Sequence, residues 1–200
     1  MGQPLQYVIQ SYANLTGSIP ANTTSITLPI AAKYASLKSL FCQMRTNQAG
    51  AVTFFPYSAE HNNLSDWRIR IGSQILPAKA PNTMVEHYAE LLKAIGSLSD
   101  INHEPTINWN NYAAAVTPVA NTESTSIAST TKSNSFYLGF DVETYSNSNK
   151  DKIFAGMNTL NSDIFWILNF SAATVALRAD FFALFDQVIM FENGMVRVVK

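Results

Sequence analysis

The chain has 200 residues, of which 47% are apolar and only 14% are charged, with a formal net charge of −1. Because globular proteins typically carry about 25% charged residues, charge is scarce here, and no cluster of Lys and Arg stands out that would neutralise phosphates. This composition argues against direct binding of nucleic acid. A chain of this length buries a core without disulfides or metals, and no window reaches the ~18 apolar residues of a membrane span.

Strand signals dominate the first half of the chain. Residues 5–12 (LQYVIQSY) and 67–76 (WRIRIGSQIL) alternate apolar and polar side chains, a period of two that is typical of half-buried β-strands. Residues 25–30, 35–46 and 51–55 are further strand candidates. The clearest apolar parity is formed by Trp67, Ile69 and Ile71.

One helix is predicted over residues 82–96 (NTMVEHYAELLKAIG). Asn82 or Thr83 supplies the N-cap, Glu86 stands three residues after Thr83 as a capping box requires, and Gly96 supplies the stop. Apolar residues recur between the caps at helical spacing. A strand-dominated chain with one inserted helix favours an all-β sandwich, and a two-layer α+β fold is the alternative.

Residues 113–135 form a polar segment rich in Ser, Thr and Ala with hardly any charge. Such a composition is too polar and too small in its side chains to form a core. We interpret it as a long surface loop rather than an interdomain linker, because the strands after it do not easily form a closed domain alone.

The last third of the chain predicts strands over residues 135–145, 164–172 and 174–185, followed by a closing hairpin. Asn193 and Gly194 would form the hairpin turn, because both central residues of a type I′ turn need positive φ. A terminal hairpin is usually tied into an existing sheet, so we expect its strands to fill core positions. The predicted core residues are Phe182, Leu184, Val188, Met190 and Val196.

The sequence contains no constellation typical of catalysis. His61, His87 and His103 lack metal-ligand spacing, and Cys42 lies in an apolar run as a buried structural thiol would. Glycine motifs that cradle phosphates or dinucleotides are absent from the sequence. We therefore expect no enzyme, no cofactor and no metal site.

Residues 107–114 (INWNNYAA) are the one segment that suits a ligand-binding loop. Trp109 and Tyr112 of this segment, together with Trp67, are candidates for exposed aromatic rings that stack on sugars. The alternative is that this loop has a structural role and packs on its own subunit. A lectin-like carbohydrate-binding β-sandwich is accordingly the alternative function.

Several segments occur in a distinctive order. "GSIPANTTSITLPIAAKYASLKSLFCQMR" leads to "WRIRIGSQILPAKAPNTMVEHYAELLKAIG", and "FYLGFDVET", "FAGMNTLNSDIFWILNF" and "RADFFALFDQVIMFENGMVRVV" follow. Together they resemble the capsid proteins of Maverick/Polinton-like and related eukaryotic DNA viruses, in which an apolar strand region leads into an Ile-Gly-Ser segment, an aromatic-rich helix and a terminal hairpin. The likeness covers most of the chain.

The resemblance implies a jelly-roll β-sandwich of two antiparallel sheets, into which the helix (82–96) and the polar loop (113–135) are inserted. The family's large capsid protein carries two jelly rolls in one chain and forms trimers. This chain has room for one, as a single domain over residues 1–200. It would be either the C-terminal roll of a longer protein, behind an added Met, or a single-jelly-roll relative.

The function implied by the resemblance is that of a viral capsid structural protein that self-assembles into an icosahedral shell. Its partners would be other capsid subunits, in a homo-oligomer such as a trimer or pentamer. It would reside in the virion capsid after synthesis in the host cytoplasm or nucleus. A cupin-like enzyme on the same fold would instead need clustered His and carboxylate ligands.

Overall fold

A computed structural model describes most of the chain, namely residues 5–46, 59–97, 107–113, 135–143, 155–192 and 195–199. Four of the features predicted from the sequence lie wholly or mostly outside these ranges: the strand over 51–55, the polar loop over 113–135, His103, and the turn residues Asn193 and Gly194.

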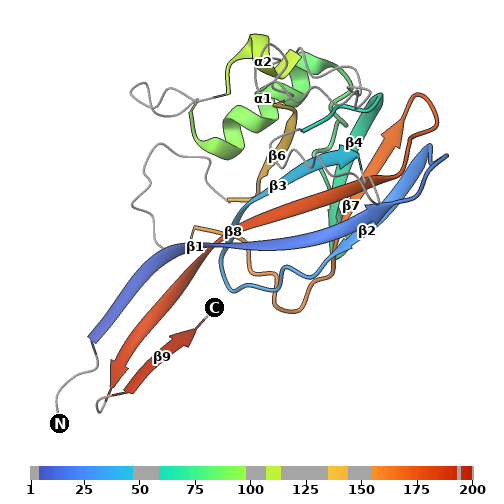
Figure 1. Ribbon diagram of the computed structural model, residues 1–200. Coiled ribbons are helices and arrows are strands. Elements are labelled where there is room, and N and C mark those ends of the chain that lie inside the picture. The colour runs from blue at the N-terminus through green and yellow to red at the C-terminus, as the bar shows by residue number, and fades with distance from the viewer. Residues whose placement is uncertain are drawn as a thin grey trace, which may run out of the picture.

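The described residues form nine strands and two helices (Figure 1). In chain order they are β1 (Leu5–Ile19), β2 (Ser25–Ile30), β3 (Leu37–Thr46), β4 (Leu64–Ile71), β5 (Gln74–Leu76), α1 (Met84–Ile95), α2 (Trp109–Ala113), β6 (Tyr137–Asp141), β7 (Ile164–Phe170), β8 (Leu177–Glu192) and β9 (Met195–Val199).

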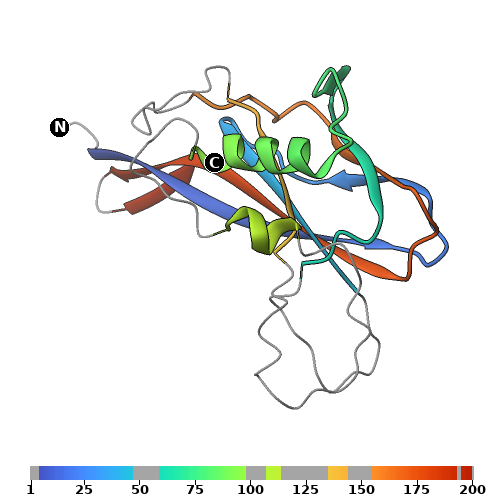
Figure 2. The same ribbon diagram turned by 90° about the horizontal axis from the view of Figure 1, so that it is seen from above.

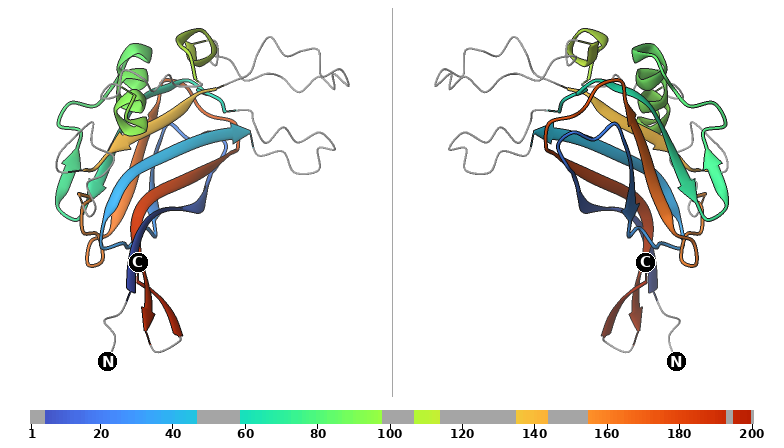
Figure 3. Two further views of the ribbon diagram at one scale, coloured as in Figure 1. Left: turned by 90° about the vertical axis from the view of Figure 1, so that its left-hand side faces the viewer. Right: turned by 90° about the vertical axis from the view of Figure 1, so that its right-hand side faces the viewer.

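The strands form two antiparallel sheets that face each other (Figure 3). Sheet A has the order β1-β8-β3-β6, with β9 also paired to β8, and sheet B has the order β2-β7-β4-β5. The pairs β1·β8, β2·β7, β3·β6 and β4·β5 are nested, as if one long hairpin had been wrapped around a core. This arrangement is a jelly-roll β-sandwich, so the predicted fold class is confirmed.

Large aromatic side chains from sheet B fill the middle of the sandwich. Trp67 and Trp166 are both fully buried, with ring centroids 5.5 Å apart, and Trp166 lies 5.8 Å from Phe181 of sheet A. The predicted apolar parity of β4 is confirmed, since Trp67, Ile69 and Ile71 are all buried. The predicted single strand over 67–76 is instead a hairpin, because Gly72 adopts a φ of +59° and turns the chain from β4 into β5.

The core side of β8 is opposite to the one predicted. Leu177, Ala179, Phe181, Ala183 and Phe185 face the core, whereas Phe182 and Leu184 are half-buried on the outer face of sheet A. Ala179 and Ala183 are fully buried despite their small side chains, and they alternate with Phe181 and Phe185 on the inner face. The prediction followed the bulkier residues, and bulk alone does not tell which face of a strand meets the other sheet.

The remaining predicted core residues also lie outside the core. Val188 and Met190 are half-buried, and Val196 is 62% exposed. The predicted hairpin pairing is present, because β8 and β9 are antiparallel with Glu192 opposite Met195. These two strands pair beyond the end of sheet B and not within the sandwich.

Helix α1 covers the outer face of sheet A (Figure 2). As predicted, Thr83 is its N-cap and accepts a hydrogen bond from the backbone N–H of Glu86 at 3.3 Å, and Gly96 ends it with a φ of +81°. The helix lies so close to β6 that a Cβ added to Gly139 would stand 2.9 Å from Ala94 Cβ and from Leu91 Cδ1. Gly139 therefore permits the helix to rest directly on the sheet.

Candidate assembly surface

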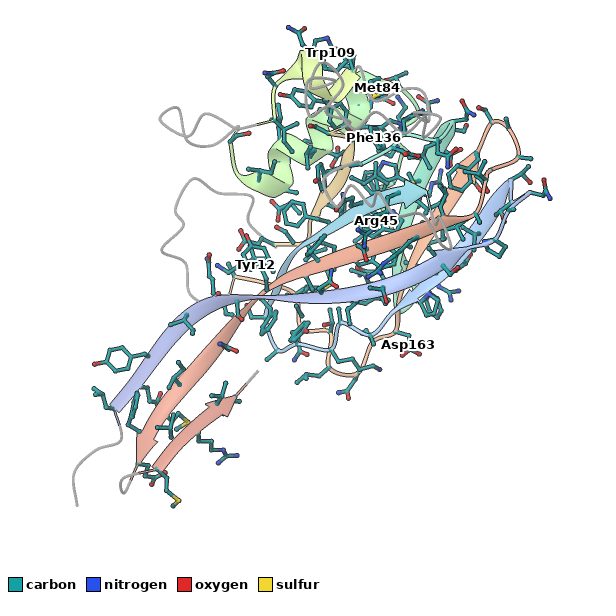
Figure 4. All side chains as sticks on the ribbon, viewed as in Figure 1. Tyr12, Arg45, Met84, Trp109, Phe136 and Asp163 are labelled. Atoms are coloured by element: carbon teal, nitrogen blue, oxygen red, sulfur yellow. The ribbon has the colours of Figure 1, made fainter. Side chains whose placement is uncertain are left out.

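The two aromatic residues of the segment 107–114 that were proposed for sugar stacking do not form an open platform. Tyr112 is fully buried on α2, and its hydroxyl donates a hydrogen bond to the Tyr137 carbonyl oxygen at 3.1 Å. Trp109 is 40% exposed and packs edge-on against Tyr88 of α1, with ring centroids 5.5 Å apart (Figure 4). Tyr112 was thus wrongly placed on the surface: its ring anchors α2, and the segment packs on its own subunit.

The buried imidazole of His87 meets the half-buried imidazole of His61 beneath α1. His61 and His87 lie 6.2 Å apart, both pack edge-on against Phe136, and His87 Nδ1 accepts a hydrogen bond from the Trp67 indole at 3.1 Å. Burial lowers the pKa of each imidazole to about 4, and the His61 charge further lowers that of His87. They are therefore neutral packing elements near pH 7.

The described ranges contain no group of three or more His, Cys, Asp and Glu side chains arranged to hold a metal ion. Nor does any helix within those ranges have the length and apolar character needed to cross a membrane.

The outer face of sheet A carries an apolar groove of about 230 Å³ beside α1. It is lined by Tyr12, Phe41, Leu91, Ile95, Ile107, Tyr137 and Phe182. Phe182, which the sequence placed in the main core, thus packs with the helix on the opposite side of its sheet. Tyr12 forms one wall and is 64% exposed, so the groove opens to solvent.

A buried ionic cluster marks the place where β8 leaves the sandwich. The Asp186 carboxylate lies 3.4 Å from Lys38 Nζ and accepts a hydrogen bond from the Ser36 hydroxyl at 2.8 Å. Lys38 Nζ also lies 3.3 Å from Glu143. The β3–β8 pairing skips Lys38, with Leu37 opposite Phe185 and Ser39 opposite Leu184, so a β-bulge accommodates this residue.

Beyond this cluster, sheet A continues as a three-stranded projection that sheet B does not cover (Figures 1 and 3). We call this projection the arm and define it as residues 5–10 of β1, 187–192 of β8, and β9; the remainder is the body. The register of β1 against β8 is unbroken from Ile19 opposite Leu177 to Leu5 opposite Phe191, so inward and outward positions keep their alternation along the whole pair.

The arm exposes an apolar face on the side that continues the core. Two complete cross-strand rows lie on it, Leu5–Phe191–Val196 and Tyr7–Ile189–Val198, and Ile9 begins a third row opposite Gln187. Tyr7 and Phe191 pack edge to face with centroids 6.0 Å apart. The exposed fractions of Leu5, Tyr7, Ile9, Phe191, Val196 and Val198 range from 39% to 62%. We call these rows the arm face.

The arm face was not predicted from the sequence. Its residues alternate as those of a buried strand do, and the hairpin was accordingly assigned to the core. In the structure, β1 and β8 have 15 and 16 residues, about twice the seven residues of β7 in the facing sheet. Strands so much longer than those of the facing sheet extend beyond it.

The fold is shared with viral capsid proteins of known structure. A crystal structure of PBCV-1 VP54, fitted into a reconstruction of the virophage Sputnik, matches with a TM-score of 0.58 and 12% identity over 99% of this chain and 52% of that one. A chain of the cryo-EM structure of the Sputnik virophage matches with 0.54 and 10% identity over 99% and 39%. The mavirus major capsid protein matches with 0.51 and 11% identity over 99% and 42%.

No protein-family model matches the sequence, and no curated protein matches it either. The matched structures are double-jelly-roll capsid proteins, and this chain spans about half the length of the first and less of the others. The resemblance inferred from the sequence is confirmed at the level of the fold: the chain has the jelly-roll architecture of these viral capsid proteins.

Proposed function

We propose that the chain is a capsid structural protein that assembles with other capsid subunits into an icosahedral shell. The observation that carries this proposal is the nested jelly-roll pairing, which aligns with viral capsid proteins over 99% of the chain. The low charge of the sequence and the solvent-exposed apolar arm face support it, because exposed apolar patches of this kind mark protein–protein contacts.

In this proposal residues 1–200 act as one jelly-roll domain whose role is structural and not enzymatic. Its partners are further capsid subunits, in trimers or pentamers, and its location is the virion after synthesis in the host cytoplasm or nucleus. The matched structures carry two jelly rolls per chain, so in this proposal the chain is either one roll of a longer polypeptide or a single-jelly-roll relative.

The lectin-like alternative relied on exposed aromatic rings at Trp67, Trp109 and Tyr112. Trp67 and Tyr112 are both fully buried. Trp109 alone remains exposed, and its ring already packs against Tyr88. A glycan array separates the two functions, because a protein dedicated to assembly gives no signal on it.

The first test is the solution mass of the purified protein by light scattering across a concentration series, with negative-stain imaging of any large species. Trimers, pentamers or closed shells are the expected result. A species that stays monomeric at high concentration, and that also binds glycans on the array, would overturn the proposal in favour of a binding module.

A further inference from the structure

We infer that the arm face binds the same face of a second copy of this chain, around a two-fold axis that passes close to Ile189. This inference rests on the proposed capsid function and deepens it by assigning one contact surface and its partner. The two arms would pack as the two layers of a small β-sandwich, with each arm supplying the layer that the other lacks.

The continuity of sheet A from the body into the arm indicates what kind of layer would cover the arm face. Phe181 and Phe185 of β8 face the core and are 1% and 2% exposed, whereas Phe191, at the same parity, is 43% exposed. Apart from Gln187, this face of β8 stays apolar along the whole strand, and only the covering sheet ends. Because sheets cover other sheets at about 10 Å separation, the natural cover for the arm face is another sheet with an apolar side.

The distribution of charge makes the arm face compatible with a copy of itself. No charged residue lies in its two complete rows, whereas the charged arm residues Glu192 and Arg197 lie on the opposite face, as does Gln6. An isologous contact brings each residue near its own counterpart, so a charge close to the axis would meet a like charge. The arm face avoids this repulsion.

The size of the arm face suits a contact that acts together with others in an assembly. Six side chains, each 39–62% exposed, present about 500–600 Å² per copy at roughly 80–100 Å² each. A two-fold pair would then bury about 1,000–1,200 Å² in total, at the lower end of specific interfaces. Such a contact is expected to form reversibly and to depend on concentration.

Cross-linking provides the direct test, since Ile189 lies in the central strand of the arm and in the row Tyr7–Ile189–Val198. The variant Ile189→Cys would be treated with a short bismaleimide, because sheets about 10 Å apart exceed the reach of a disulfide. Val188→Cys is the matched control: it is the adjacent, also half-buried residue on the opposite face. The native Cys42 is 1% exposed and contributes little background.

Ile189→Cys is expected to give a cross-linked dimer in high yield, and Val188→Cys to remain largely monomeric on a denaturing gel. Equal yields from both variants, or no dimer from Ile189→Cys, would overturn the inference. The latter result would mean that a different surface, or a further part of a longer chain, covers the arm face.

A second pair of variants tests the contact without cross-linking. Val198→Glu places a charge on the arm face, and Val199→Glu places the same charge on the opposite face of β9, where the exposure is similar (49% and 40%). In sedimentation velocity, Val198→Glu is expected to weaken dimerisation at least tenfold, whereas Val199→Glu leaves it unchanged. Dimerisation that survives Val198→Glu would contradict the inference.

These outcomes separate the arm contact from the capsid function. Trimers or shells that form although Ile189→Cys is not trapped would refute the arm contact and leave the capsid proposal standing. A trapped arm dimer that never builds larger species, even at high concentration, would support the contact and count against the capsid proposal.

Discussion

Strands β1 and β8 run through both the body and the arm, and the two regions differ in what covers these strands. In the body, Phe181 of β8 is 1% exposed and packs against Trp166 of sheet B. In the arm, Phe191 of the same strand faces the same way but is 43% exposed and contacts Tyr7 within its own sheet. The alternation of side chains is identical in the two regions, so the facing layer alone decides which apolar residues form a core.

An apolar strand face is stabilised when another layer covers it, and this chain provides such a layer for only part of sheet A. In the body, sheet B covers one face of sheet A and α1 covers the other. In the arm, the apolar face is exposed. In a protein proposed to assemble, we expect a neighbouring subunit to bind such an exposed face.

The largest expected difference in unfolding free energy comes from truncating one large aromatic side chain in the body and one in the arm. Trp166→Ala should lower the free energy of unfolding by about 3–5 kcal/mol, because it empties the centre of the body. Phe191→Ala should lower it by less than about 1 kcal/mol, since Phe191 is 43% exposed. Urea denaturation at low protein concentration measures both. Similar losses for the two variants would mean that arm and body share one core.

The ionic cluster at the junction of body and arm predicts the next largest change in unfolding free energy. Asp186→Asn would remove the carboxylate that lies 3.4 Å from the buried Lys38 ammonium, and we expect a loss of about 3 kcal/mol in unfolding free energy. Glu192→Gln, an exposed carboxylate on the arm, is the control and should change stability by less than about 0.5 kcal/mol. If Asp186→Asn is as mild as its control, the cluster does not hold β8 at the junction.

The close contact of α1 with β6 predicts a smaller effect, again confined to the body. Gly139→Ala would force the new Cβ to within 2.9 Å of Ala94 and 3.1 Å of the Leu91 backbone, so the helix must shift. We expect a loss of about 1–3 kcal/mol by urea denaturation, with the dimerisation of the arm unchanged. An unchanged stability would show that α1 rests loosely on sheet A.

The local signals in the sequence predicted the parts of the fold that depend on neighbouring residues. Thr83, Glu86 and Gly96 fixed the ends of α1, and the alternation that begins at Trp67 marked the core face of β4. Gly72 also carried a local signal, since an isolated glycine in a strand pattern often marks a change of direction, but the pattern was extended across it.

The parts that failed depend on residues far away in the chain. Ala183 looks like a poorer core residue than Phe182, yet Ala183 is fully buried on the inner face of β8 and Phe182 is half-buried on the outer face. Tyr112 looks exposed beside Asn residues until α1 and Phe136 close around it. To predict the arm face, one would need to know where sheet B ends, and the sequence of a single strand does not contain this information.

The smallest expected effect is a pH dependence that belongs to the body, because His61 and His87 lie there and the described arm has no histidine. Burial lowers the pKa of both imidazoles to about 4, below the ordinary value of 6.5. The unfolded chain therefore binds more protons between pH 6.5 and 4, so stability is full above pH 6.5 and falls as the pH decreases through this window.

His61→Phe isolates one of the two imidazoles, because His61 packs edge-on against Phe136 and its Nδ1 has no hydrogen-bond partner among the described residues. Between pH 7 and 5 the variant should lose about 1–2 kcal/mol less stability than the wild type. Urea denaturation at both pH values gives this difference, and carboxylates shared by the two proteins cancel from it. Identical pH profiles would mean that His61 reaches solvent without unfolding, and that the body is looser beneath α1 than at the two tryptophans.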